Sequence, residues 1–117
     1  MNYRKFDLEE RLIDFGVLII EASERLPKTA AGRHLADQLL RSGTAPALVY
    51  GEAQAAESKK DFVHKMKIAL KELRETSINL RMLLKANMLI DEPLLSESRQ
   101  LVAIFQKSVD TAKGGET

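Results

Sequence analysis

Four stretches of the chain carry apolar residues every three or four positions, a spacing that is typical of amphipathic helices. They predict helices over residues 7–26, 30–57, 59–87 and 92–112, followed by a flexible tail at 113–117. Asp7, Ser58 and Asp91 stand where N-cap side chains would start three of these helices. Short connections between four helices predict an all-α fold, an up-down-up-down four-helix bundle that occupies residues 1–117 as one domain.

The first predicted helix has an apolar side that is wider than one bundle seam requires. Leu12, Phe15 and Ile19 lie along its centre, and Ile13 and Ile20 widen it to roughly half the circumference. Surplus apolar surface of this kind usually meets another chain. Apolar residues within or beside polar arcs of the first three helices give the predicted oligomer interface: Val17, Leu18, Leu48 and Ile68.

The second predicted helix contains a glycine and a proline near its middle. Leu39, Ser42, Pro46 and Val49 keep one helical phase across this stretch, which favours one long helix. Because Pro46 removes the amide that would bond back to Ser42, we expect the helix to bend there. Two helices joined by a turn at 42–46 would suit Gly43 and Pro46 equally well.

Composition agrees with a helical protein and excludes several classes of site. Of 117 residues, 44% are hydrophobic, 5% aromatic and 30% charged. The net charge of +1 does not indicate any class of binding partner. The absence of cysteine excludes disulfides, thiolate nucleophiles and zinc-thiolate sites. The charged N-terminus lacks a signal-peptide pattern, and no apolar run approaches the ~20 residues that cross a bilayer. We therefore expect a cytoplasmic protein that has no membrane association.

The third predicted helix carries most of the directional charge. Residues 59–85 hold eight Lys or Arg and three acids, a net charge of +5, whereas residues 1–58 carry −2. A row of cations along one helix could follow a phosphate backbone. The alternative is a solvated face that acids of another helix or subunit partly neutralise. The candidate nucleic-acid-binding residues are Lys60, Lys67, Lys71, Arg74, Arg81 and Lys85.

No pattern in the chain predicts catalysis, a metal site or a cofactor. A di-metal bundle site would need Glu-x-x-His on two helices, and neither His34 nor His64 has a glutamate three residues before it. Both histidines project toward polar arcs, which predicts surface positions. The serines lie in no nucleophile elbow, and Gly43 and Gly51 lack the spacing of a phosphate-binding loop.

Three segments carry a resemblance to a known family. They are F-D-L at 6–8, L-P-K-T-A-A-G-R-H-L-A-D-Q-L-L-R-S-G-T-A-P at 26–46 and G-E-A-Q-A-A-E-S-K-K-D-F at 51–62. With I-A-L-K-E-L-R-E-T at 68–76, they resemble the bacterial four-helix-bundle family found within intervening sequences of large-subunit ribosomal RNA genes. The chain is also similar to the accessory proteins of diversity-generating retroelements. It departs from the family at Leu48-Val49, where alanine-asparagine is usual, and at Ala45, where serine is usual.

The resemblance implies a long second helix and a ring of five subunits around an open centre. Similarity to the retroelement proteins implies a basic surface of the ring that contacts nucleic acid and a reverse transcriptase, and this surface corresponds here to the six cations of the third helix. Glu52 and Glu75 match family positions as well, and we interpret them as structural polar contacts. The hypothesis is therefore a non-enzymatic homo-oligomer, a pentamer, that binds structured RNA or DNA. The alternative is an oligomeric scaffold for another protein.

Overall fold

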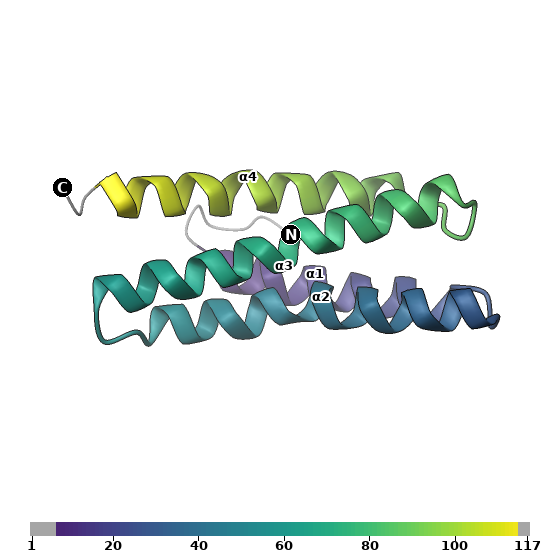
Figure 1. Ribbon diagram of the computed structural model, residues 1–117, viewed down its shortest axis with the longest axis horizontal. Helices are drawn as coiled ribbons and strands as arrows, with labels where there is room; N and C mark the ends of the chain where they lie inside the picture. Colours follow the sequence, from purple (N-terminus) through teal and green to yellow (C-terminus); the bar gives the residue numbers. More distant parts are fainter. Residues whose placement is uncertain (1–6, 115–117) are drawn as a thin grey trace.

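The computed structural model describes residues 7–114, which form four α-helices and the turns between them. The helices are α1 (Leu8–Glu24), α2 (Ala30–Gln54), α3 (Lys59–Lys85) and α4 (Glu92–Gly114). Each helix packs against the next along the chain, and α4 also contacts α1, so α1 and α3 lie diagonally opposite each other. Figure 1 shows the helices side by side along a bundle of 49 × 30 × 21 Å. The predicted all-α four-helix bundle is confirmed.

A capping side chain precedes each helix and satisfies one of the amides that the first turn leaves unpaired. Asp7, Thr29, Ser58 and Asp91 each accept a hydrogen bond from the amide three residues later, at 3.4, 3.0, 3.0 and 3.1 Å. Three of these caps are those that the sequence predicts. Local side-chain chemistry therefore fixes where the helices begin.

The helix ends differ from the prediction by two or three residues. α1, α2 and α3 end earlier than predicted, at residues 24, 54 and 85. Beyond each end, a backbone amide donates a hydrogen bond to the carbonyl three residues before it, which tightens the last turn. The amide of Arg25, for example, donates to the carbonyl of Ala22 at 3.1 Å. α4 runs on to Gly114 and so includes the first two residues of the tail predicted at 113–117. Residues 115–117 lie outside the described residues.

Asn87 ends α3 with a left-handed backbone conformation. Its φ is 58°, a value that asparagine tolerates better than most residues. The amide of Met88 donates to the carbonyl of Leu83 at 3.0 Å, and that of Asn87 donates to Leu84 at 3.2 Å. This pair of bonds is a Schellman motif, which satisfies the last carbonyls of α3 and turns the chain toward α4.

α2 is a single helix through residues 42–46, with Pro46 buried inside it. The continuous helix is therefore confirmed, and the alternative of two helices is wrong. Gly43 is required here because a Cβ would lie 2.6 Å from Cγ1 of Ile19, so only glycine lets α1 and α2 approach this closely. The bend at Pro46 stays a prediction.

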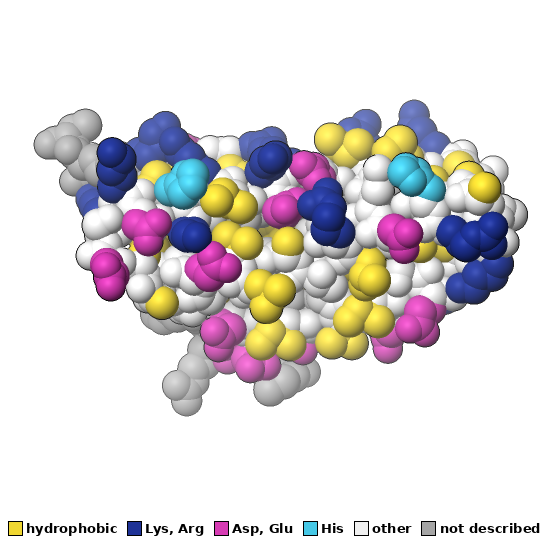
Figure 2. Space-filling view, turned by 60° about the horizontal axis from the view of Figure 1, so that its bottom comes forward, with side chains coloured by type: hydrophobic (Ala, Val, Ile, Leu, Met, Phe, Trp, Pro, Cys, Tyr) yellow, Lys and Arg dark blue, Asp and Glu magenta, His cyan; other side chains and the backbone are white. Residues whose placement is uncertain are grey.

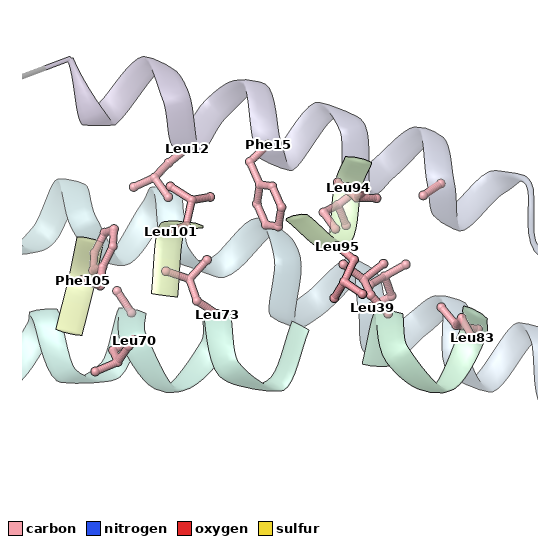
Figure 3. Packing of buried hydrophobic residues seen from close by; sticks show 14 of the residues in the cluster. Leu12, Phe15, Leu39, Leu70, Leu73, Leu83, Leu94, Leu95, Leu101 and Phe105 are labelled. Carbon is pink, nitrogen blue, oxygen red and sulfur yellow. The ribbon is translucent and has the colours of Figure 1, made fainter. Parts of the chain in front are cut away.

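Apolar side chains from all four helices fill the centre of the bundle. Figure 3 shows the labelled part of this cluster, in which Phe15 of α1 and Phe105 of α4 are among the largest buried side chains. Full burial of each such side chain contributes about 1.5–3 kcal/mol relative to exposure. Among residues 7–114, no helix is both long and apolar enough to cross a membrane.

A small polar cluster is enclosed between α2 and α3. Thr76 and Ser42 are fully buried, and Thr76 Oγ1 lies 3.0 Å from Ser42 Oγ. Asn79 Nδ2 donates to the same Ser42 oxygen at 3.4 Å. Every buried side-chain nitrogen or oxygen in the described part of the chain has a hydrogen-bond partner, so the interior is electrostatically satisfied.

Candidate nucleic-acid interface

The six predicted cations all lie on the outer side of α3, and all six are exposed. At ~100° per residue they fall within about 80° of the helix circumference, and at 1.5 Å per residue they extend over about 38 Å. None of them forms an ion pair with any of residues 7–114. The guanidinium of Arg74 donates a hydrogen bond to Oε1 of Gln106 at 2.5 Å.

Two acids of α3 form ion pairs with an arginine of α2. The Arg41 guanidinium contacts Glu72 at 3.1 Å and Glu75 at 2.8 Å. Its hydrogen bond lowers the pKa of Glu75, and the nearby charge of Lys71 lowers it further. Because Arg41 offsets one of these two negative charges, the two carboxylates compensate the cations only in part.

A second ion pair links the beginning of α3 to the end of α2. Lys65 Nζ lies 2.8 Å from Oε1 of Glu52, which raises the pKa of Lys65. Glu52 and Glu75 are therefore structural polar contacts, as the sequence predicts. Lys65 is turned toward α2 and does not belong to the outward row of cations.

The cations of α3 divide into two segments of different chemistry. The lysine segment consists of Lys60, Lys67 and Lys71, and no large exposed apolar side chain lies between residues 59 and 73. In the second segment, Ile78 and Met82 are 53% and 47% exposed among the cations. We call this second segment the arginine face; with one residue of α4 it comprises Arg74, Ile78, Arg81, Met82, Lys85 and Arg99.

A shallow groove of about 320 Å³ lies within the arginine face, between α3 and α4. Its basic lining comes from Arg74, Arg81 and Arg99, and Ile78 and Val102 supply apolar surface. The sequence-based prediction missed Arg99 because it considered cations on one helix only. It also missed Ile78, although the spacing from Arg74 and Arg81 places this isoleucine inside the cationic arc.

The structure exposes three of the four apolar residues predicted for an oligomer interface. Val17 is 48% exposed, Leu18 45% and Leu48 71%, whereas Ile68 is half-buried. Figure 2 shows hydrophobic side chains grouped on one face of the bundle, with acidic side chains along its lower edge. Because Leu48 is exposed, its side chain does not pack in the core. Its interface role stays a prediction.

Both histidines are exposed, as predicted, and they lie on different helices. Within residues 7–114, no three His, Asp or Glu side chains are close enough together to hold a metal ion. The cationic outer side of α3 is the candidate site.

Comparisons with known proteins agree with this fold. The model of the 23S rRNA-intervening sequence protein family matches residues 4–109. The chain is similar to the crystal structure of a protein of unknown function from the S23 ribosomal protein family of Bacteroides thetaiotaomicron. The two are 27% identical with a TM-score of 0.81, over 87% of this chain and 97% of the other. No curated protein matches the chain.

Proposed function

Because the chain belongs to the 23S rRNA-intervening sequence protein family, we propose that it is a non-enzymatic homo-oligomer that binds structured RNA or DNA through α3. The family resemblance implies a pentameric ring. The observation that carries the nucleic-acid proposal is the row of exposed cations on α3 that have no ion-pair partner among residues 7–114.

Cations arranged in this way bind phosphates mainly by releasing condensed counterions. Each phosphate that is neutralised on duplex DNA contributes about −0.9 to the slope of log affinity against log salt. Such contacts fix position and charge, and they carry no sequence information directly. We therefore expect α3 to recognise the shape and charge of a structured nucleic acid and to show little base preference.

The lysine segment is the part of α3 best suited to phosphates. Lysine is a strongly hydrated point charge on a flexible stem, and residues 59–73, which include Lys60, Lys67 and Lys71, contain no large exposed apolar side chain. In an oligomer, each subunit would add one such segment, and several weak contacts would combine into a higher avidity. This combination makes a small domain with few cations an effective binder.

The test is fluorescence anisotropy of a labelled structured RNA and a duplex DNA in a salt series. We expect log affinity of the parent protein to fall steeply with log salt. The double variant Lys67→Glu/Lys71→Glu should reduce the slope by about two for each subunit that contacts the nucleic acid, because each lost phosphate contact removes about one. The melting temperature should stay nearly unchanged, since both side chains are exposed.

The matched control is Lys28→Glu/Arg33→Glu, which makes the same charge change around the start of α2, at the other end of the bundle from the start of α3. It should leave the salt slope as it is. Absent or salt-insensitive binding by the parent protein would contradict the nucleic-acid role. A specific protein that stays bound after nuclease treatment would instead support the scaffold alternative, which the exposed Leu48 and Ile90 favour.

A further inference from the structure

The outer side of α1 is opposite in charge to the arginine face of α3. We call it the acidic face, and it comprises Glu10, Ile13, Asp14, Val17, Ile20, Glu21 and Glu24. Its four carboxylates form no ion pair with any of residues 7–114. The nearby cations Arg11 and Arg25 are already paired with Glu97 and Asp91, so this face keeps its negative charge.

Both faces mix charge with exposed apolar side chains. On α1, Ile13, Val17 and Ile20 are 43%, 48% and 42% exposed and follow one another at helical spacing. On the arginine face, Ile78 and Met82 are exposed to a similar degree. At 1.5 Å per residue, the acidic face is about 21 Å long and the α3 part of the arginine face about 17 Å. The two surfaces are therefore similar in length and in exposed apolar content, and they carry opposite charges.

We propose that the acidic face of one copy of this chain docks on the arginine face of the next copy. The inference rests on the homo-oligomer proposed above and identifies its contact surfaces. The two faces belong to α1 and α3, which are diagonal in the bundle, so they point to opposite sides. One chain can therefore use both faces at the same time, each with a different neighbour.

Charge disfavours the symmetric alternatives. A two-fold contact of either face with itself would place carboxylates against carboxylates or guanidinium groups against guanidinium groups, which is strongly unfavourable at an interface. Two different faces in contact give a head-to-tail interface, and such an interface closes into a ring or grows into an open chain. The proposed ring of subunits needs this kind of contact.

The division of α3 into two segments follows from this arrangement. Arginine forms planar, bidentate contacts and is less strongly hydrated than lysine, so it suits ion pairs at interfaces. All the arginines of α3 belong to the arginine face, beside exposed apolar residues, and the lysine segment lies outside it. In the docked assembly the arginine face contacts a neighbour, and the lysine segment stays open for phosphates.

The test uses charge reversal in the full chain, treated with nuclease so that nucleic acid cannot bridge subunits. One variant carries Asp14→Lys/Glu21→Lys on α1, a second carries Arg74→Glu/Arg81→Glu on α3, and a third combines all four changes. Sedimentation velocity gives the mass, against 13.1 kDa for one chain. We expect a parent assembly larger than a dimer, dissociation of the first two variants, and reassembly of the combined variant, in which opposite charges face each other again.

Circular dichroism of each variant shows whether it is folded, since only folded variants bear on the interface. The control Lys67→Glu/Lys71→Glu should keep the parent mass while its nucleic-acid binding weakens. An assembly that survives the α1 reversal, or a folded combined variant that remains monomeric, would overturn the docking contact and leave the nucleic-acid proposal intact. A monomeric parent protein would overturn the contact and the oligomer together.

Discussion

The inner and outer sides of α3 differ in where their polar groups find partners. On the inner side, Thr76 and Asn79 are buried and hydrogen-bonded to Ser42 of α2. On the outer side, Lys60 and Lys67 are exposed and have no ion-pair partner in the described chain. The buried polar groups of α3 therefore have partners within the chain, whereas its outer cations have no ion-pair partner in the described chain.

This difference separates stability from binding. An unpaired buried polar group destabilises a fold, so the inner side has to be satisfied within the chain. Exposed charges contribute little to folding, so the outer side is free to serve a partner. Substitutions on the inner side should change the free energy of unfolding, and substitutions on the outer side should change binding.

The largest effect is expected from the core of the inner side. Leu73 is fully buried, and Leu73→Ala should lower the free energy of unfolding by about 2–5 kcal/mol through lost burial and a residual cavity. Urea denaturation measures this loss. The control Ile90→Ala, at a side chain that is 96% exposed, should change stability by less than about 0.5 kcal/mol. Equal losses in the two variants would contradict the distinction between buried and exposed positions.

Much of this architecture follows from local rules that act within a few residues. Helical spacing indicates the four helices. Asp7, Ser58 and Asp91 mark three of their starts, because an N-cap side chain bonds only to an amide in the first turn that follows it. The unbroken phase from Leu39 to Val49 predicts the continuous α2, even though Pro46 is a local helix breaker. Here burial along one face outweighs the local preference.

Features that depend on two helices were not predictable in this way. The polar contact between Ser42 and Thr76 joins residues that are far apart in the sequence, and only the packing of α2 on α3 brings them together. Arg99 reaches the candidate site because α4 lies beside α3. The half-burial of Ile68 likewise depends on neighbouring helices, which a helical projection of one segment does not contain.

A smaller effect is expected from the buried hydroxyl of Thr76. Thr76→Val keeps the side-chain shape and removes the oxygen that contacts Ser42, so Ser42 loses a partner inside the protein. We expect the free energy of unfolding to fall by about 1–2 kcal/mol, measured by urea denaturation. The control Thr111→Val, at an exposed position of α4, should be nearly neutral. An unchanged stability in Thr76→Val would show that the buried contact does not hold α2 and α3 together.

The smallest effect is expected at the border between the two sides, where Arg41 holds Glu72 and Glu75. Arg41→Gln should raise the pKa of Glu75 toward the ordinary carboxyl value of 4.5, because the hydrogen bond from Arg41 is the main cause of its lowering. Titration of the Glu75 carboxyl by NMR measures this shift. The control Arg25→Gln, which removes the ion pair with Asp91, should leave the Glu75 titration unchanged.

The sign of the accompanying stability change follows from the lowered pKa of Glu75. A carboxyl whose pKa is lowered by folding stabilises the native state above its ordinary pKa, and this contribution is lost as the pH falls through the folded value. The melting temperature of Arg41→Gln should therefore lie slightly below that of the parent at neutral pH, and the two should converge in acid. Arg41→Gln also leaves two carboxylates uncompensated beside Lys71, so nucleic-acid affinity should weaken slightly at low salt. A difference in melting temperature that grows in acid would show that Arg41 does not hold Glu75 in its charged form.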